Sequence, residues 1–257
     1  MKKRGQVAVF IILALLIIII VMFLIYLRQS TGKDPVTEIK EGQIDDSNLR
    51  KFVQSCVDST SKKAVFYLGF VGGNLKEDVF ENFYNVMEDY KIPYYYFDKR
   101  SYILDEEGFK TKILAQYMKE NLQKCTAEFK DFKYLKVTEK NPEINVVLGE
   151  NEVIFNVKYP IKIDRGFLGT NLESSYQSKV PARLKEIISI AQEIVKREVE
   201  NERYIHWDYM NEATSRGYNI TAYTEKDSTI VYRIVDLKSE IDDEFYVFQW
   251  ANRMSLR

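Results

Sequence analysis

Hydrophobic residues follow three different patterns along this chain, and each pattern predicts a different kind of element. The first is a run at residues 7–27, where 21 consecutive residues are uncharged and only Tyr26 has a polar side-chain atom. A helix rises about 1.5 Å per residue, so a run of this length spans the roughly 30 Å hydrocarbon core of a bilayer. Because no side of such a helix is polar, the run predicts a membrane-spanning helix and not a core helix of a soluble domain.

The flanks of this run favour a retained anchor whose start lies in the cytoplasm. The apolar core of a cleaved secretory signal is about 7–15 residues long, whereas this run is longer and has no small-residue cleavage site after Leu27-Arg28. The basic group Lys2-Lys3-Arg4 crowds its start, which favours residues 28–257 on the outer side of the membrane. We therefore expect residues 1–28 to be a cytoplasmic stub and transmembrane helix of a single-pass cell-membrane protein. One expected partner of the chain is the lipid bilayer, which residues 7–27 would span.

The second pattern is a three- and four-residue repeat of apolar positions, which predicts helices that pack on a core. Polar residues 29–46 come first, with two Gly and one Pro, and predict a linker. A helix is then predicted from Asp46 or Ser47 to near Gly69, with the stripe Leu49, Phe52, Val53, Cys56, Val57, Ala64 and Leu68. Further helices are predicted over Glu77–Tyr90, over Asp105–Phe129 with the stripe Leu114, Met118, Leu122, Cys125 and Phe129, and from Pro181 with the stripe Leu184, Ile187, Ile188, Ala191, Val195 and Val199.

The third pattern is alternation, or a short apolar run between turn residues, and it predicts strands. The segment Val153–Lys158 alternates, and the turn Gly149-Glu150-Asn151-Glu152 joins it to Ile144–Leu148 as a hairpin. Other strands are predicted at Tyr94–Phe97, Tyr176–Val180, Tyr218–Tyr223, Thr229–Val235 and Phe245–Ala251. Strands segregated from helices predict the α+β class. We expect residues 47–257 to form an extracytoplasmic domain of antiparallel strands with three to four helices, and a division into two subdomains near residue 170 is left open.

Charge and residue counts narrow the partners of this domain. Without Lys2, Lys3 and Arg4 the chain carries 34 basic and 38 acidic residues, a net charge of −4, which argues against nucleic acid as a partner. One His and two Cys are too few for a zinc site, and the segment GFVGGN at Gly69 lacks the Lys of a phosphate-binding loop, so we expect no metal and no cofactor. The 18 Tyr, 15 Phe and 2 Trp suit contacts with protein partners or sugars, or an aromatic core.

The two cysteines are candidates for a disulfide. Cys56 and Cys125 each lie on the apolar stripe of a predicted helix, and an even number of cysteines outside the cytoplasm favours a bridge. The alternative is a pair of buried thiols that act as small hydrophobic side chains.

Three polar groups are candidates for catalysis or ion binding, and none gives a strong signal. Ser59 to Lys62 matches the S-x-x-K pattern of penicillin-binding enzymes, but Ser30 to Lys33 matches it as well and the companion K-T-G is missing. His206 follows Ile205 and precedes Trp207, a context typical of a packed aromatic residue. The acidic group Asp242, Asp243 and Glu244 lacks the spacing of a calcium loop and predicts a solvated turn. We expect no catalytic residue.

The stretch Lys3-Arg4-Gly5-Gln6 before the apolar run resembles the leader of archaeal type IV pilin-like proteins. The resemblance implies cleavage by a prepilin peptidase between Gly5 and Gln6. The chain departs from that pattern at Phe10, where many pilins have Glu, and Pro35 ends the helix early. The wider layout resembles uncharacterised anchored surface proteins of small-genome archaea, through the segments GQV, FVQSC, GFVGG, NLQKC and YVFQWANR.

These patterns lead to a hypothesis about location and role. The chain is expected to be a single-pass membrane-anchored surface protein with a structural or interaction role in the cell envelope or in a pilus-like assembly. The alternative is a membrane-anchored extracytoplasmic hydrolase that acts on envelope material. Asn219-Ile220-Thr221 is the only N-glycosylation sequon, so Asn219 is a candidate for modification if its face is extracytoplasmic.

Overall fold

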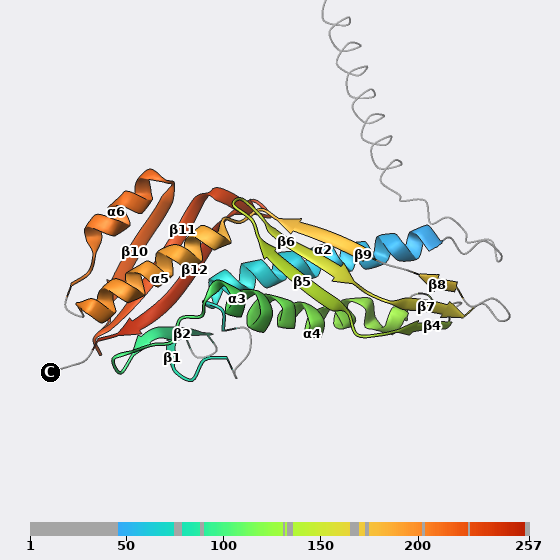
Figure 1. The fold of residues 1–257 in the computed structure, drawn as a ribbon, viewed down its shortest axis with the longest axis horizontal. Helices are drawn as coiled ribbons and strands as arrows, with labels where there is room; N and C mark the ends of the chain where they lie inside the picture. The colour runs from blue at the N-terminus through green and yellow to red at the C-terminus, as the bar shows by residue number, and fades with distance from the viewer. Residues whose placement is uncertain are drawn as a thin grey trace, which may run out of the picture. The chain divides into compact units, whose positions relative to one another are not determined.

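The structure is a computed structural model of the 257-residue chain. It describes residues 46–74, 79–87, 90–130, 132, 136–164, 170–172, 175–201, 204–225 and 227–254. Residues 46–257 form one compact unit (Figure 1). The predicted stub, membrane helix and linker up to residue 45 lie outside the described residues, and so do Gly5 and Gln6. Within the described ranges, no helix combines the length and the apolar character that crossing a bilayer requires.

The α+β class is confirmed, but the largest sheet is mixed. Its neighbouring strands are, in order, β1 (Phe83–Met87), β2 (Tyr90–Phe97), β12 (Glu244–Arg253), β11 (Thr229–Ile241) and β10 (Tyr218–Thr224), and β3 (Arg100–Ser101) also pairs with β2. The expectation of antiparallel strands alone was wrong, because β2 runs parallel to β12 with Tyr94 opposite Ala251. A parallel pair requires a long crossover connection, and here most of the domain lies between the two strands.

Two three-stranded sheets complete the β structure. One has the order β5 (Glu143–Leu148), β6 (Val153–Lys158) and β9 (Ser175–Val180), and the other has the order β4 (Lys136–Glu139), β7 (Ile161–Asp164) and β8 (Thr170–Leu172). The predicted hairpin is confirmed, with Leu148 opposite Val153. Val153, Phe155 and Val157 are buried as their alternation predicts. The sequence did not predict β4, β7 or β8, which are short.

The predicted helices are confirmed at three of four places. Helix α2 (Asp46–Phe70) matches the first prediction. The helix predicted over Asp105–Phe129 is built from α3 (Glu106–Gly108), a π-helical turn η1 (Phe109–Leu114), α4 (Ala115–Thr126) and a 3₁₀ turn η2 (Ala127–Phe129). It begins where the predicted boundary lies, because the Asp105 side chain accepts a hydrogen bond of 2.7 Å from the Gly108 backbone N–H.

The helix predicted over Glu77–Tyr90 is wrong. In the described part of that segment, residues 83–87 form β1 and pair with β2, with Tyr84 opposite Ile92. Aromatic and β-branched residues such as Phe83, Tyr84 and Val86 favour a strand when a partner strand is present. The Tyr84 ring also contacts the Tyr94 ring, with centroids 6.4 Å apart.

The helix predicted from Pro181 exists, but it begins later, at Leu184, and its buried stripe ends at Glu198 instead of Val199. Helix α5 (Leu184–Glu200) begins after Arg183, because the Arg183 backbone N–H donates to Ser239 Oγ at 3.2 Å. The Arg183 side chain is bound by the fully buried Asp236 on β11, which also accepts a 2.6 Å hydrogen bond from Ser239. Helix α6 (Trp207–Ser215) follows and was not predicted.

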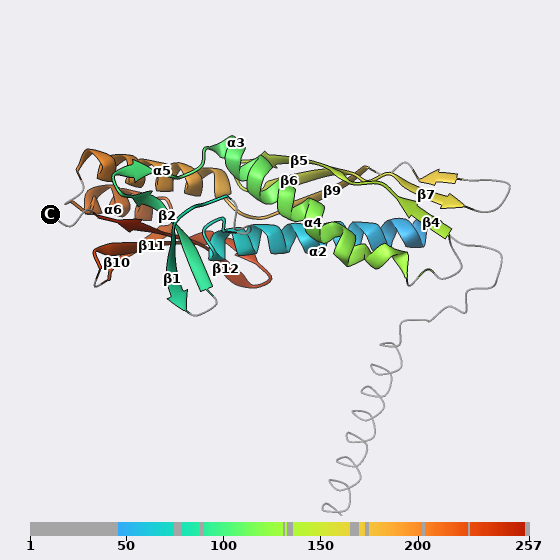
Figure 2. The ribbon, with the colours of Figure 1, turned by 90° about the horizontal axis from the view of Figure 1, so that it is seen from below.

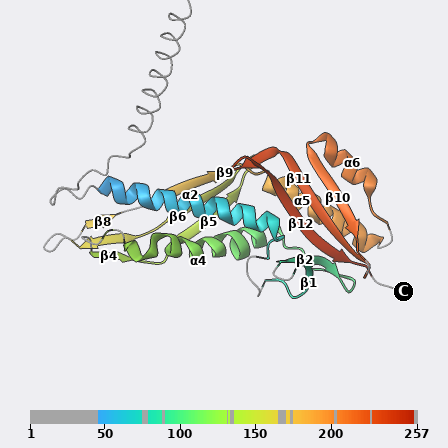
Figure 3. The same ribbon diagram turned by 180° about the vertical axis from the view of Figure 1, so that it is seen from behind.

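Helix α2 connects the parts of the domain. It packs on β9 and α4 along its length and on β12 at its end, and Figures 2 and 3 show α2 and α4 side by side. At that end the backbone of β12 approaches Gly69 so closely that a Cβ atom there would lie 2.1 Å from the carbonyl oxygen of Val247. A glycine is therefore required at position 69 by the backbone-to-backbone approach.

The predicted disulfide is confirmed. Cys56 on α2 and Cys125 on α4 are bonded, with Cα atoms 5.6 Å apart. Cys56 is buried as its stripe predicts, whereas Cys125 is exposed, so the prediction of two inward-facing cysteines was wrong for Cys125. The bridge lies at the margin of the α2–α4 contact. Disulfides persist in oxidising compartments, and this one suggests an extracytoplasmic environment for the domain.

The first prediction tests the approach of α2 to β12. Substitution Gly69→Ala should lower the free energy of unfolding by about 1–3 kcal/mol, because the added methyl group overpacks the contact with Val247. Alanine normally stabilises a helix relative to glycine, so a loss must come from the clash. Urea unfolding of the purified chain measures the effect, with exposed Ser55→Ala on the same helix as control. Equal or greater stability of Gly69→Ala would contradict the close approach.

The second prediction concerns the bridge. Replacing both Cys56 and Cys125 by Ala should cost about 4 kcal/mol of stability in the chain-entropy model, since the bridge closes a loop with a sequence separation of 69. Because Cys125 is exposed, a thiol reductant should also open the bridge in the folded chain and lower the urea midpoint to the same extent. The double variant should not respond to the reductant, and an unchanged midpoint in the reduced native chain would refute the prediction.

Candidate functional site

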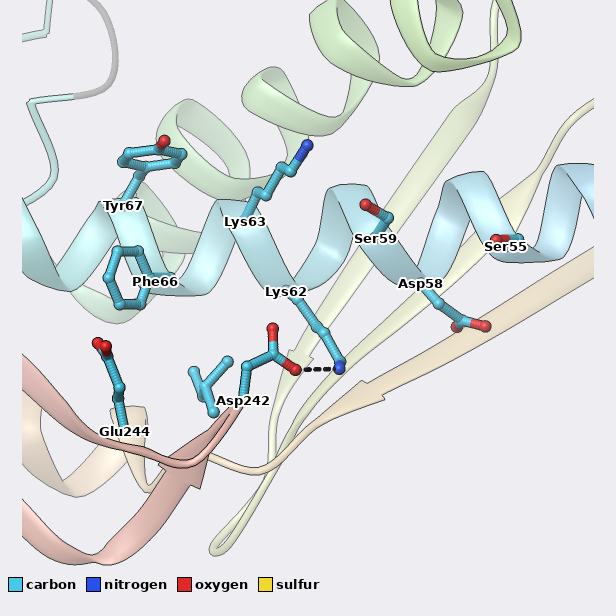
Figure 4. Close-up of a pocket in the computed structure, with 10 residues that line it drawn as sticks. Ser55, Asp58, Ser59, Lys62, Lys63, Phe66, Tyr67, Asp242 and Glu244 are labelled. Atoms are coloured by element: carbon cyan, nitrogen blue, oxygen red, sulfur yellow. Dashed lines mark hydrogen bonds and ion pairs between the residues drawn. The ribbon is translucent and has the colours of Figure 1, made fainter. Parts of the chain in front are cut away.

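Polar side chains gather in a groove between α2 and the turn that joins β11 to β12. Its volume is about 500 Å³. The groove is shown in Figure 4 and is lined by Ser55, Asp58, Ser59, Lys62, Lys63, Phe66, Tyr67, Ile241, Asp242 and Glu244. It therefore brings together two motifs that are far apart in the sequence, the S-x-x-K segment and the acidic group.

The shape of the β11–β12 turn places the acidic group. Ile241 and Glu244 are opposite each other, so the loop consists of Asp242 and Asp243, both in the left-handed region with φ of 52° and 67°. A two-residue loop of this kind matches the twist of the strands, and Asp tolerates that backbone better than most residues. The turn directs Asp242 to α2, where Lys62 Nζ donates to its carboxylate at 2.5 Å.

This geometry does not activate Ser59 as a nucleophile. A lysine that serves as the base for a serine must be neutral, which requires a lowered pKa. Here the hydrogen bond and the charge of Asp242 raise the pKa of Lys62, so its amine is protonated at neutral pH. Figure 4 shows the Lys62 side chain directed to Asp242 and away from Ser59. The groove offers charges of both signs and aromatic rings for binding, but Ser59 and Lys62 do not form a catalytic dyad.

A partly exposed row of aromatic side chains continues from the groove to the end of α2. We define the aromatic strip as Phe66, Tyr67, Phe70 and Tyr90. The rings of Phe66 and Phe70 are stacked at 6.1 Å, and Phe70 lies 4.7 Å from Tyr90 on β2. Tyr67 and Phe70 remain 44% and 43% exposed. The strip is held in place because the Phe70 carbonyl accepts hydrogen bonds from the Tyr90 hydroxyl and from Gln249 Nε2.

The other sequence candidates are separate from the groove. His206 lies just before α6, where its ring contacts Tyr204 at 4.8 Å and its Nε2 is 3.3 Å from the Arg197 carbonyl. Asn219 is exposed on β10. In the described ranges, no three His, Cys, Asp or Glu side chains are grouped so that they could hold a metal ion.

A buried carboxyl group, Glu198 on α5, was missed by the sequence prediction. The stripe of α5 was expected to continue at Val199, but Val199 is 47% exposed and Glu198 is 0% exposed. The Tyr232 hydroxyl on β11 and the Asn252 amide on β12 both donate to Glu198. A signal was present, because Glu198 lies three residues after Val195 and four after Ile194 on the apolar stripe. Only the folded domain shows that hydroxyl and amide donors meet it there.

The surroundings of Glu198 change its acidity. Burial raises its pKa to about 7, and the hydrogen bonds from Tyr232 and Asn252 only partly offset this. Trp250 stacks against Tyr232 at 5.1 Å and against Tyr95 at 5.7 Å, which keeps water away on the sheet side. The carboxyl is therefore about half protonated at neutral pH, and the charged form is the less stable one in this site.

The third prediction follows from this raised pKa. The unfolded chain releases the Glu198 proton near pH 4.5 and the folded domain near pH 7, so stability should fall by about 3 kcal/mol as pH rises through this window. Glu198→Gln should remove this slope and be the more stable form at pH 8. The Asn252 Oδ1 atom has no partner among the described residues, and it can accept from the introduced glutamine amide after a flip of the Asn252 amide.

Urea unfolding between pH 4.5 and pH 8 measures the slope. Glu200→Gln, at an exposed position on the same helix, is the matched control and should keep the slope of the parent chain. The change in stability of the Glu198→Gln variant across this window is subtracted from that of the parent chain. A remaining change of zero would show that Glu198 is charged in the folded domain.

Comparison with known proteins does not assign the chain to a family. No protein-family model, no curated protein and no solved structure matches it. The features of the structure that bear on function are therefore the groove, the aromatic strip and the disulfide.

Proposed function

We propose that the chain is a single-pass membrane-anchored surface protein whose extracytoplasmic domain binds protein partners in the cell envelope or in a pilus-like assembly. The observation that carries the interaction role is the aromatic strip beside a groove of mixed charge. Exposed aromatic residues next to charged ones are typical of protein interfaces, where aromatic side chains are enriched and a few residues supply most of the binding energy.

The location is supported by independent features of the chain. The uncharged residues 7–27 are long enough for an anchor, and the segment before them resembles the pilin-like leader that is cut between Gly5 and Gln6. The Cys56–Cys125 bridge supports an oxidising environment for the domain. The role in a pilus-like assembly rests on the leader resemblance alone.

The alternative is an anchored hydrolase that acts on envelope material. One observation favours it, because Ser59, Lys62 and Asp242 line the same groove. The protonated state of Lys62 argues against it, since the amine cannot take the proton of Ser59 while it is bound to Asp242. Binding is therefore the function that this geometry supports best.

The fourth prediction tests the aromatic strip in intact cells that produce the full chain. Photo-reactive benzoylphenylalanine at position 67 or 70 should cross-link to a protein partner, and the same group at position 204, also exposed, should not. A Tyr67→Ser, Phe70→Ser double substitution should weaken capture of that partner at least about tenfold, because loss of an aromatic hot spot costs more than about 1.4 kcal/mol.

The controls separate location from binding and binding from catalysis. A membrane-impermeant protease should remove residues beyond 46 from intact cells, and protection of the domain would overturn the proposed orientation. Equal cross-linking at positions 67, 70 and 204 would overturn the role of the strip. Labelling of Ser59 by a serine-directed phosphonate probe, lost in Ser59→Ala, would favour the hydrolase.

A further inference from the structure

One face of the β10–β11 part of the largest sheet is not covered by a helix of the described chain, whereas the end of α2 lies against β12, where Gln249 donates to the Phe70 carbonyl. Helix α5 lies over the other face, where Tyr232 and Trp250 are buried against it (Figure 1). Figure 3 looks onto the side of β10, β11 and β12 that is opposite α5. The strand register places three rows of side chains across it: Asn219, Val235 and Val247; then Thr221, Arg233 and Gln249; then Tyr223, Val231 and Ala251.

These rows mix apolar and polar side chains, and Ala251 is fully buried in a small cluster with Ile92 and Tyr94. Arg233 is their only charged side chain, and Tyr223 is 53% exposed at the outer end of its row. Val235 and Val247 are partly exposed in the first row. Strand β10 also ends the order of this sheet, so its outer backbone groups have no strand partner among the described residues. Partly exposed valines beside an open edge favour aggregation unless something covers them.

The sequon lies on β10, at the open edge of this face. Asn219 is exposed on β10, directly opposite Val235, and its amide can be reached from solvent. Thr221 is two residues further along the strand, so its hydroxyl is on the same face as the Asn219 amide. Val247 is two strands away from Asn219, about 10 Å at the usual spacing of strands, which the first sugars of a glycan can cover.

We propose that Asn219 carries an N-linked oligosaccharide that covers Val235 and Val247 and shields the β10 edge. This inference rests on the extracytoplasmic location in the proposed function. The donor is an oligosaccharide linked through phosphate to a polyprenol. A bond forms between Asn219 Nδ2 and the sugar C1, the C1–O bond to the phosphate breaks, and Nδ2 loses one proton to the transferase. The polyprenyl phosphate leaves, and no atom changes oxidation state.

The position of the sequon and the exposure of the valine row both favour a glycan at Asn219. A glycan is large, hydrated and unable to pair with a strand, so it opposes edge-to-edge association without adding charge. Its sugar rings can lie on the valine row while their hydroxyl groups face water. Asn219 is the only position of the chain that has both the acceptor sequence and this place on the open face.

The fifth prediction is tested on the full chain purified from membranes of a host that glycosylates N-x-S/T sequons. The tryptic peptide 217–226, which contains Asn219, should carry a series of sugar masses, and its unmodified form should be the minor species. Asn219→Gln and Thr221→Ala should lose the whole series. Thr221→Ser, which keeps the sequon, should retain it and is the matched control.

The same tryptic digest, run without reductant, also tests whether the domain lies in an oxidising environment. If it does, the Cys56–Cys125 bridge joins peptides 52–62 and 125–130. A bridged pair with unmodified Asn219 overturns the glycan and leaves the proposed location standing. Free thiols at Cys56 and Cys125 with unmodified Asn219 overturn both.

Coverage of the valine row has its own readout. The Asn219→Gln chain should bind more of an apolar fluorescent dye than the glycosylated chain, and adding Val235→Ser and Val247→Ser should return dye binding to the parent level. Equal dye binding with and without the glycan would overturn the covering role.

Discussion

The approach of helix α2 to the backbone of β12 is the contact on which the arrangement of the domain depends. Gly69 lies against the Val247 carbonyl, with no room for a side chain. Because the same helix packs on β9 and is bonded to α4 through Cys56, this one contact relates the C-terminal strands to the middle sheet. Three rings of the aromatic strip lie on the last turns of α2, so their position relative to Tyr90 on β2 and to β12 follows from the same approach.

Two buried polar groups fix α5 on the inner face of the sheet, and they do so in different ways. Arg183 and Asp236 form a charged pair whose carboxylate also accepts from Ser239 and from the Lys238 backbone N–H at 3.0 Å. Every oxygen of that carboxylate has a donor, as a buried charge requires. Glu198, at the other end of α5, has only neutral donors, and burial therefore shifts it to the protonated form.

The groove illustrates why a motif must be judged by its surroundings. The S-x-x-K spacing places Ser59 and Lys62 within one turn of α2, which is a condition for a dyad and not a sufficient one. The β11–β12 turn presents Asp242 to the same lysine and keeps it protonated. The groove and the neighbouring strip are then better suited to reversible contact with a partner than to acyl transfer.

Local patterns in the sequence were sufficient for the strongly periodic elements: the stripes of α2 and α4, the hairpin of β5 and β6, and the strands β9 to β12. Apolar period depends on a residue and its near neighbours, so it can be read without the fold. The same stripes also indicated that Cys56 and Cys125 lie on neighbouring helices. The strand β1, the parallel pairing of β2 with β12 and the burial of Glu198 in place of Val199 could not be read in this way. Each depends on a partner far away in the chain, a β2 strand for Phe83 and Tyr84, or the hydroxyl of Tyr232 for Glu198, and such partners meet only when the domain has folded.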